Sequence, residues 1–483
     1  MPVVNVSCYV CLSVCLRASE RGSGWCLLWC GGEGRLVSRT SKTRPNNMWV
    51  PSLSHSLKAM EGRGKQQQTH FYCCAYSSSP LSVVDIAMKL IERTAGRPML
   101  SEKRRATLES MYALVGTHSA VKLCRWQKSM MRGRGGCYKW TMYGIQSHQC
   151  MEATPSMACA NKCVFCWRLN TNPTATEWKW QVDDPQTVVD GMLSSHRALI
   201  QGVRGMPGVT EKALEEAMNP KHCALSLVGE SVLYPYVNTF LHLLHERGLS
   251  TFLVNNGQFP DALRELTPVT QLYLSVDAPN RETMKLLDRP VFPDYWERFQ
   301  QSMVHMSERK ERTVFRLTMI NGFNMSEENL LEYKTLFETG RPNFVELKRL
   351  TPAFSGNSRS ILRIKNVPSW EQLKAYGRRL CEVIFDGKAY EVASLHEHSG
   401  CVLLAEKRFK IDGNWHTWID FGKFHAMVID PALSKQITAD AYLRPTPRWA
   451  LPESAAEGFD PSQTRHLTAR RLKHMAAAKV AND

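Results

Sequence analysis

The sequence predicts an α/β protein built around an incomplete TIM-like barrel. After residue 166, short apolar runs alternate with amphipathic segments of helical period. Strands and helices that alternate in this way form parallel βα units with right-handed crossovers. With one strand just ahead of residue 157 included, the array amounts to about six or seven βα units, fewer than a complete barrel has.

The expected elements follow one another in a regular order from residue 223 onward. Each apolar run is short enough to be a strand, and each segment between two runs repeats its apolar residues at helical spacing. The predicted strands are residues 223–228, 251–254, 272–276, 314–320, 344–347 and 391–393, and the predicted helices are residues 236–247, 260–266, 295–306, 327–337 and 370–384.

Four regions are predicted along the chain. Residues 1–85 are poor in acidic residues and rich in Arg, Ser and Gly, which is typical of an unstructured or targeting extension. A helical pattern begins near Pro80. Residues 86–142 carry spaced cysteines, residues 143–390 form the core barrel, and residues 391–483 form a C-terminal extension that we expect to contact substrate.

Composition limits the partners and the compartment. The net charge of +16 and the pI of about 9.2 favour a polyanionic partner such as RNA. No apolar run is as long as the roughly 18 residues of a membrane span, so we expect no membrane insertion. Closely spaced thiols argue for a reducing compartment. We therefore expect the cytoplasm, with a mitochondrion or another organelle as the alternative because of the acid-poor N-terminus.

The most informative stretch is residues 157–168, which read MACANKCVFCWR. Cys159, Cys163 and Cys166 are separated by three residues and then by two. Three thiolates in one short loop can hold three corners of an iron–sulfur cube. The alternatives are a structural zinc loop, which needs a fourth ligand, or unpaired thiols.

A second array of cysteines precedes this loop. Cys124, Cys137 and Cys150 are separated twice by twelve residues. Such loose spacing is weak by itself, but directly upstream of the first loop it predicts a second cluster. Between these cysteines lie cations and aromatic residues, a pattern that suits an RNA-facing surface or, alternatively, a solvated face: Arg125, Lys128, Arg132, Arg134, Lys139 and His148, with Trp126, Tyr138, Trp140 and Tyr143.

Polar residues end several of the predicted strands. In a barrel of parallel strands, ligands bind at the carboxyl ends of the strands. Arg316 lies inside the fifth strand and Lys348 closes the sixth. Each strand-end residue alone is an ordinary turn former or cap. Together they predict a ligand-binding rim, with cofactor-binding candidates Gly229, Glu230, Asn256, Ser275 and Asp277.

Near the C-terminus the sequence reads His396-Glu397-His398-Ser399. The two histidines alternate in a strand-like register and would then lie on one face, where they could bind a metal. Hydrogen bonding to a substrate or to each other is the more common role for such residues. Their part in substrate binding stays open.

These features together resemble the radical S-adenosylmethionine superfamily and, within it, the tRNA 4-demethylwyosine synthase family of wybutosine biosynthesis. The resemblance extends from about residue 124 to residue 465. It rests on both cysteine arrays and on the motifs CYKWTMYGIQSHQC, TPSMACANKCVFCWRLNTNP, SLVGESVLYP, LYLSVDAPN, EHSGCVLLA, TPRWAL and GFDPSQTR.

The resemblance implies two 4Fe–4S clusters and S-adenosylmethionine as cofactors. The cluster on the loop of residues 157–168 would leave one iron open to S-adenosylmethionine and reduce it to a 5′-deoxyadenosyl radical. The second cluster would present an open iron to pyruvate. Lys139 matches the family lysine that forms a Schiff base with pyruvate. An amine attacks a ketone only when it is neutral, and we expect the cluster, Arg132 and Arg134 to lower the pKa of Lys139; a contact with RNA phosphate is the alternative.

The implied reaction joins N1-methylguanosine beside the anticodon of tRNA-Phe to pyruvate and yields 4-demethylwyosine. Many eukaryotic members carry an N-terminal flavodoxin-like domain that binds FMN. The residues before Cys124 show no alternating βα pattern, so we expect no FMN domain in this chain and a separate flavodoxin or ferredoxin donor. We expect a monomer. The competing readings are another radical enzyme that modifies RNA, and a non-catalytic RNA-binding protein stabilised by zinc.

Overall fold

A computed structural model gives the fold of the protein. It describes residues 96–465, apart from residues 168, 170 and 352–360, and three strands nearer the N-terminus. The chain divides into two compact units, Met1–Leu81 and Ser82–Asp483. The predicted helical pattern after Pro80 and the basic tail beyond residue 465 lie outside the described residues.

The first unit contains a three-stranded antiparallel sheet in the order β1-β2-β3. Its strands are β1 (Leu12–Arg17), β2 (Gly24–Trp29) and β3 (Leu36–Thr40). We expected an unstructured or targeting extension here, and these strands differ from the first of those alternatives. The cause is local: Leu, Val and Trp in short runs favour strands, although the segment as a whole is polar. A targeting role stays a prediction.

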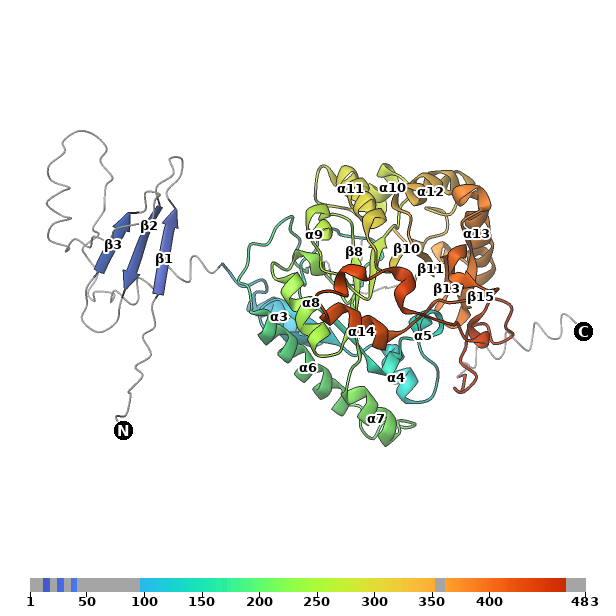
Figure 1. Cartoon of the computed structure of the whole chain (residues 1–483), viewed down its shortest axis with the longest axis horizontal. Coiled ribbons are helices and arrows are strands. Elements are labelled where there is room, and N and C mark those ends of the chain that lie inside the picture. Colours follow the sequence, from blue (N-terminus) through green and yellow to red (C-terminus); the bar gives the residue numbers. More distant parts are fainter. Residues whose placement is uncertain are drawn as a thin grey trace, which may run out of the picture. The chain divides into compact units, whose positions relative to one another are not determined.

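The second unit is organised around a ten-stranded sheet (Figure 1), in the order β12-β13-β11-β10-β9-β8-β7-β6-β5-β4. Its six central strands are parallel. They are β6 (Cys150–Thr154), β7 (His222–Leu225), β8 (Ser250–Asn255), β9 (Gln271–Ser275), β10 (Thr313–Met319) and β11 (Phe344–Arg349). Because the sheet does not close, the predicted incomplete TIM-like barrel is confirmed.

Antiparallel strands complete both ends of this sheet. At one end, β4 (Ala113–Val115) pairs with β5 (Ser119–Lys122), which pairs with β6. At the other end, β13 (Cys401–Glu406) lies between β11 and β12 (Tyr390–His396). The strand predicted at residues 391–393 is therefore not a seventh βα unit. It is the first strand of a hairpin, β12–β13. The second strand, β13, was not predicted, because we looked for strands separated by helical segments and no helix lies between β12 and β13.

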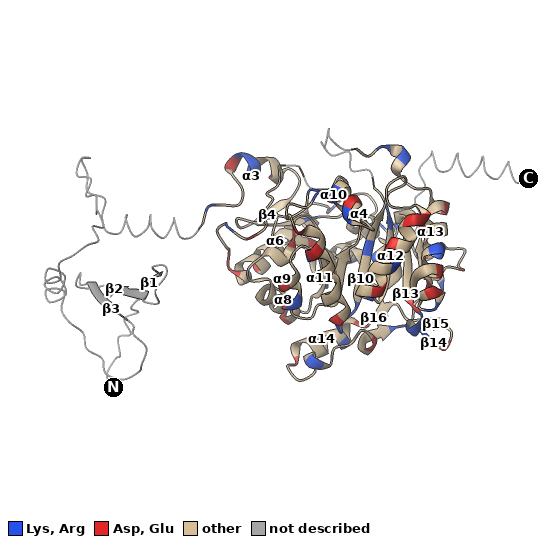
Figure 2. Ribbon diagram, turned by 90° about the horizontal axis from the view of Figure 1, so that it is seen from above, with Lys and Arg blue, Asp and Glu red and all other residues tan. Residues whose placement is uncertain are grey.

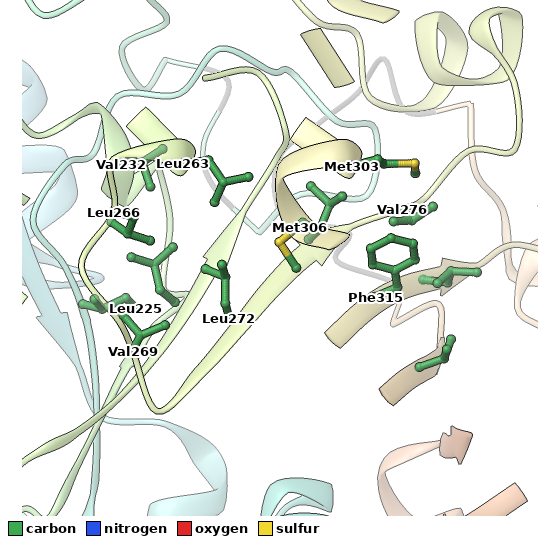
Figure 3. Close-up of a cluster of buried hydrophobic side chains, with 14 of the residues drawn as sticks. Leu225, Val232, Leu263, Leu266, Val269, Leu272, Val276, Met303, Met306 and Phe315 are labelled. Atoms are coloured by element: carbon green, nitrogen blue, oxygen red, sulfur yellow. The ribbon is translucent and has the colours of Figure 1, made fainter. Parts of the chain in front are cut away.

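Helices cover the outer face of the parallel strands (Figure 1). They are α6 (Pro185–Gln201), α7 (Glu211–Met218), α8 (Val237–Glu246), α9 (Pro260–Arg264), α10 (Arg281–Leu287), α11 (Tyr295–Glu308), α12 (Glu327–Gly340) and α13 (Trp370–Val383). Leu225, Leu272 and Phe315 from the strands pack with Leu263 and Met303 from the helices (Figure 3). This apolar layer anchors each strand, so the strand ends hold fixed positions.

The inner face of the sheet has a different composition. On β10, Phe315 and Leu317 belong to the outer apolar layer, so Arg316 and Thr318 point to the inner side. A second apolar cluster packs residues of α5 (Tyr138–Tyr143) and α14 (Phe421–Ile429) against residues of the strands, such as Phe252 and Phe344. The C-terminal region predicted as a separate extension thus shares a core with the barrel.

Two short helices carry the segment between the barrel edge and β6. They are α4 (Arg125–Met131) and α5, and α3 (Glu102–Glu109) lies before them. Short two-residue strands β14 (Lys410–Ile411), β15 (Asn414–Trp415), β16 (Trp418–Ile419) and β17 (Leu443–Arg444) form two small pairs near the C-terminus.

Acidic and basic residues both occur on the outer helices, for example on α3, α12 and α13 (Figure 2). Charges of both signs on one helix favour solvent exposure and cancel locally. Among the described residues, no helix is both long and apolar enough to cross a membrane.

Candidate active site

The loop of Cys159, Cys163 and Cys166 lies over the carboxyl ends of the parallel strands. All three cysteines line one cavity there. The amide of Asn161 and the side-chain Nδ2 of Asn256 each lie 3.4 Å from the Cys159 Sγ, as donors. Burial raises the pKa of Cys163 well above its usual value, and the carboxylate of Asp288 adds to that shift. Such a thiol stays protonated until a metal displaces its proton.

Gly229 and Glu230 follow β7 and meet the cysteine loop directly. Gly229 has a φ of +76°, and a Cβ atom at this position would lie 1.9 Å from the carbonyl oxygen of Ser156. Only glycine allows this approach. The amide of Glu230 then donates to the carbonyl of Ala158, at 2.7 Å. The turn after β7 therefore holds the start of the cysteine loop in place.

The Glu230 carboxylate is buried with one oxygen left open. Its Oε2 accepts the amide of Asn256 at 3.0 Å, and its Oε1 has no hydrogen-bond partner. Burial raises the pKa of Glu230 to about 8. A buried carboxyl oxygen without a partner is costly unless a ligand donates to it. Glu230 is thus suited to bind an ammonium or hydroxyl group.

The other predicted rim residues line the same cavity. Ser275 ends β9, and Asp277 Oδ1 accepts the amide of Thr318 at 2.6 Å. All five predicted cofactor-binding residues and the three cysteines of the loop therefore surround one cavity: Gly229, Glu230, Asn256, Ser275 and Asp277 with Cys159, Cys163 and Cys166. This grouping follows from the parallel strands, because their carboxyl ends meet at one edge.

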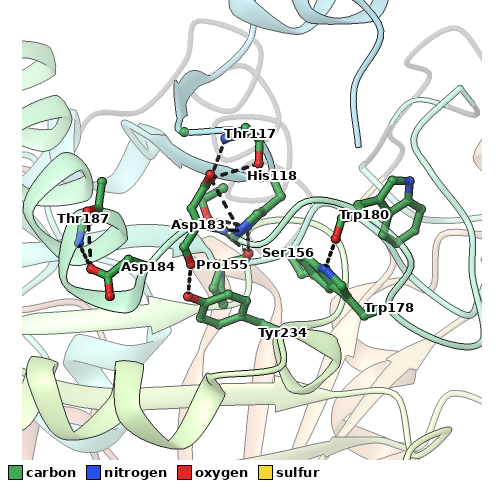
Figure 4. A network of polar contacts seen from close by, with 12 residues as sticks. Thr117, His118, Pro155, Ser156, Trp178, Trp180, Asp183, Asp184, Thr187 and Tyr234 are labelled. Atoms are coloured by element: carbon green, nitrogen blue, oxygen red, sulfur yellow. Dashed lines mark hydrogen bonds and ion pairs between the residues drawn. The ribbon is translucent and has the colours of Figure 1, made fainter. Parts of the chain in front are cut away.

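A network of polar contacts joins Pro155, just before the cysteine loop, to His118 and Asp183 (Figure 4). Asp183 Oδ2 accepts from the amide and the hydroxyl of Thr117, at 2.6 and 3.0 Å. His118 accepts the Asp183 amide on Nε2 at 3.0 Å, so its Nδ1 carries the proton and donates to Pro155 O at 2.6 Å. The hydroxyl of Tyr234 donates to Asp183 O at 2.7 Å. Sequence patterns did not indicate this network, since its members lie far apart in the chain.

The second cysteine array forms a separate group beside β6. Cys124 caps α4, Cys137 precedes α5 and Cys150 begins β6. The three thiols are close enough that Cys137 and Cys150 both raise the pKa of Cys124, after burial and the charge of Glu152. None of the three lines the cavity of the first loop. The structure thus brings the array together, while its role as cluster ligands stays a prediction.

Lys139 lies two residues after Cys137, on α5, and is close enough to Cys150, Glu152 and Arg316 for their charges to shift its pKa. Burial by itself would lower its pKa, but the nearby Cys150, Cys137 and Glu152 outweigh burial, and the net pKa lies above the usual value. The cation that acts against this rise is Arg316. The expectation that Arg132 and Arg134 would lower this pKa is therefore wrong.

Arg132 does not face Lys139 because its Nε donates to the carbonyl of Pro207 at 2.8 Å. The aromatic part of the RNA-facing prediction also needs correction. Tyr138 and Tyr143 are buried, and Tyr143 donates to Glu346 at 2.9 Å. Their places in α5 turn them inward, which the pattern of the sequence could not distinguish from an exposed face.

The histidines near the C-terminus do not share a strand. His396 ends β12, whereas Glu397–Ser399 form a 3₁₀ turn. His396 Nδ1 lies 2.6 Å from the hydroxyl of Ser399, and the ring centroid of His398 lies 5.2 Å from that of Trp126. The expected strand register is wrong because Gly400, at a φ of +60°, turns the chain into β13.

Charged residues inside the barrel connect the two cysteine groups. Arg316 and Lys348 line the cavity of the first loop, while Glu152 forms a hydrogen bond with Cys124 of the second array. Glu346 lies beside Arg316 in the register of β10 and β11. From the sequence, Arg316 and Lys348 were expected only as members of the ligand-binding rim, without individual roles. The missed signal was a charge at alternate positions of strands that are otherwise apolar.

Among the described residues, no group of three or more His, Cys, Asp or Glu side chains is arranged around a single metal ion. A structural zinc site needs its four ligands at one ion, at about 2.0–2.3 Å. In a 4Fe–4S cube, by contrast, each cysteine binds its own iron, so the thiols stand further apart. The described residues therefore contain no ready-made zinc site, and the open Glu230 oxygen lines the same cavity as the three thiols.

Comparison with known proteins adds family evidence to this geometry. Residues 154–333 match the Radical SAM superfamily, and residues 339–406 match the family described as wyosine base formation. Two solved structures are similar to this chain. One is TYW1 with a lysine–pyruvate adduct bound, with 31% identity, a TM-score of 0.55, and coverage of 64% of this chain and 97% of that chain. The other is archaeal TYW1, with 30% identity, a TM-score of 0.52, and coverage of 65% and 99%.

A curated relative of Arabidopsis thaliana, an S-adenosyl-L-methionine-dependent tRNA 4-demethylwyosine synthase, is 47% identical over 92% of this chain and 69% of its own length. The chain belongs to this synthase family. The resemblance drawn from the motifs is therefore confirmed. The synthase TYW1 of Mus musculus is 48% identical over 79% of this chain, which spans about half, 53%, of the mouse protein.

Family membership fits the cavity described above. The Radical SAM match supports S-adenosylmethionine and one 4Fe–4S cluster as cofactors of this chain. The match spans Cys159, Cys163 and Cys166 together with the strand ends through β10. The wyosine match covers β11, β12 and β13, and so includes Glu346, Lys348 and the turn of Glu397–Ser399.

Proposed function

We propose that this chain is a radical S-adenosylmethionine synthase that joins N1-methylguanosine in tRNA-Phe to pyruvate and forms 4-demethylwyosine. The observation that carries the proposal is the barrel interior. Arg316 lines the cavity of Cys159, Cys163 and Cys166, and its charge also acts on Lys139, which lies close to Cys137 and Cys150 of the second group. A radical enzyme without a second, carbonyl-bearing substrate has no need of a lysine and a second thiol array in the same interior.

The first cavity is assigned to S-adenosylmethionine and one 4Fe–4S cluster. When bound, this cluster supplies the electron that cleaves S-adenosylmethionine to a 5′-deoxyadenosyl radical and methionine. The open Glu230 oxygen accepts a hydrogen bond from the cofactor, and Asn256 holds the other oxygen in place. Ser275 and Asp277 line the side where ribose hydroxyls would lie. Burial of these groups keeps water away from the radical.

The second group is assigned to pyruvate. Cys124, Cys137 and Cys150 would hold a second 4Fe–4S cluster. The neutral amine of Lys139 attacks the ketone carbon of pyruvate, a C=N bond forms and water leaves, so the step needs no oxidant. Glu152 is close enough to raise the pKa of Lys139, and we assign to its carboxylate the proton that the amine must lose.

The partners follow from the same proposal. The net charge of +16 favours tRNA, and an electron donor of the flavodoxin or ferredoxin class would reduce the first cluster. We place the enzyme in the cytoplasm as a monomer. A mitochondrion or another organelle stays the alternative compartment.

The decisive experiment traps the imine. Anaerobically reconstituted protein, which should hold about eight irons if both clusters form, is incubated with pyruvate and cyanoborohydride. Mass spectrometry should find N-carboxyethyl-lysine on the peptide that contains Tyr138 and Trp140. Lys139→Arg should lose the adduct and the tRNA product but keep its iron, because a guanidinium stays protonated.

Lys128→Arg is the matched control, since Lys128 lies on α4 in the same segment and is only partly buried. It should keep adduct and product. Lys348 provides the competing outcome: burial lowers its pKa to about 8, so its amine is also available for attack. An adduct on Lys348 with Lys139 unmodified would refute the assignment of Lys139, and no adduct anywhere would refute pyruvate as the substrate.

A further inference from the structure

Two arginines line the cavity, Arg316 on β10 and Arg349 at the end of β11. Arg316 points inward from β10 and is partly exposed to the cavity that Cys159, Cys163 and Cys166 line. Within the described residues, its side chain makes no hydrogen bond or ion pair within the usual distances. Five N–H donors in an enclosed site, without acceptors from the protein, call for an anionic ligand.

Two acids, Glu346 and Asp277, lie near this guanidinium, but no hydrogen bond or ion pair joins either of them to it among the described residues. Glu346 is next to Arg316 in the register of β10 and β11, but its Oε1 accepts the hydroxyl of Tyr143 at 2.9 Å. Asp277 Oδ1 accepts the amide of Thr318 at 2.6 Å. Both acids give Arg316 a compensating charge at longer range, which makes its burial tolerable. Asp277 lines the same cavity as Arg316, whereas Glu346 is not part of its lining.

Lys348, another cation in this lining, already has partners in the protein. The Lys348 amine donates to the carbonyl of Ser399, and its Nζ lies 5.1 Å from the ring centroid of Tyr138. Tyr138 is the neighbour of Lys139 on α5, and the charge of Arg316 acts directly on Lys139. Arg316 therefore lines the first cavity and is close enough to the predicted imine lysine for its charge to act there.

We propose that Arg316 binds the carboxylate of the α-keto acid whose ketone carbon reacts with Lys139. This inference rests on the proposed function and assigns it a substrate-binding residue. A guanidinium accepts a carboxylate in a bidentate way, which fixes the direction of the ketone carbon as well as its distance. Arg316 thereby selects an α-keto acid over a neutral ketone and orients it toward the amine.

The test measures imine formation rather than turnover. Reconstituted full-length protein is titrated with pyruvate, and the reduced adduct on Lys139 is quantified by mass spectrometry. Arg316→Met should raise the pyruvate concentration for half-maximal adduct by about 10- to 100-fold, the usual range for a charged hydrogen bond. Arg316→Lys should recover part of this loss, since it keeps the charge without the bidentate fork. Arg264→Met, which removes a half-exposed arginine of α9, should leave the titration unchanged.

A second measurement identifies the anion. Pyruvamide, the neutral analogue, should label wild type poorly relative to pyruvate, and Arg316→Met should lose this discrimination. The affinity of Arg316→Met for S-adenosylmethionine, measured by equilibrium binding, should stay within about twofold of wild type. A change of this size is smaller than the loss of one hydrogen bond would give. An unchanged pyruvate titration, or a loss of S-adenosylmethionine affinity in its place, would overturn the assignment of Arg316. Absence of any adduct in wild type would instead refute the proposed function itself.

Discussion

Two arginines of the same strand region differ in what surrounds them. Arg312, directly before β10, is fully buried, and its Nε and Nη2 donate to Gln271 Oε1 at 3.0 Å and Thr417 O at 2.6 Å. Arg316, four residues on, faces the cavity, and no hydrogen bond links it to the described residues. One guanidinium has protein acceptors and the other does not.

The same contrast extends to the two ends of the barrel interior. At the amino ends of the strands, His222 and His245 are buried against the hydroxyls of Ser250 and Thr251, at 2.6 and 2.8 Å. At the carboxyl ends, Glu230 keeps one buried oxygen without a partner. The buried polar groups at the amino ends are thus paired within the protein. At the carboxyl ends, a buried polar atom keeps its hydrogen-bonding capacity for a ligand.

The largest expected effect compares the two arginines directly. Arg312→Met leaves the carbonyl of Thr417 and the side chain of Gln271 buried without their donor, so unfolding free energy should fall by about 3–5 kcal/mol. Arg316→Met removes a buried charge that makes no such bonds, so its change should be about 1 kcal/mol or less. Urea denaturation of both cofactor-free variants measures this. Equal losses would mean that Arg316 is also a structural residue.

Glu230 provides the next test, through pH. Burial holds its folded-state pKa at about 8, above the usual 4.5, so between these pH values the folded chain keeps a proton that the unfolded chain has released. Stability contributed in this way is present below pH 4.5 and is lost as pH rises toward 8. Gln does not titrate, so the Glu230→Gln variant should not lose stability in this range. Its free energy of unfolding, relative to that of wild type, should rise by about 3 kcal/mol between pH 5 and pH 7. A difference that does not change with pH would contradict the burial argument.

The histidine end should respond in the opposite direction, with a smaller effect. Burial lowers the pKa of His222 and of His245 to about 3, from the usual 6.5. Between these pH values the two histidines are protonated in the unfolded chain but not in the folded chain, so the free energy of unfolding falls as the pH falls. At pH 5 each histidine should cost about 2 kcal/mol. His222→Gln should flatten the acid limb of the stability curve, and an unchanged limb would show that His222 is protonated in the fold.

The sequence predicted the parallel strands well because each is a short apolar run between turn residues. The grouping of Glu230, Asn256 and Asp277 followed from strand order alone, since the chemistry of a barrel lies at the carboxyl ends of its strands. The hairpin of β12 and β13 was harder to find. Antiparallel pairing follows a tight turn, here at Gly400, and leaves no helix between the strands as a signal.

The interior charges could not be assigned from sequence. Glu346 and Lys348 occupy alternate positions of β11, which shows that they share a face but not which face is the interior. The direction of α5 decided that question, and a helix of six residues, from Tyr138 to Tyr143, carries too little periodicity to orient it. For the same reason the inward turn of Tyr138 was not anticipated.

The open sheet has a consequence for the protein in concentrated solution. An unclosed sheet leaves two edge strands, here β4 and β12, and exposed edges template pairing with other chains. β4 is only three residues long and packs beside α6, while β12 runs between α5 and α13. Both edges of the ten-stranded sheet are therefore short or covered, and intermolecular strand addition at this sheet is blocked without any closure of the barrel.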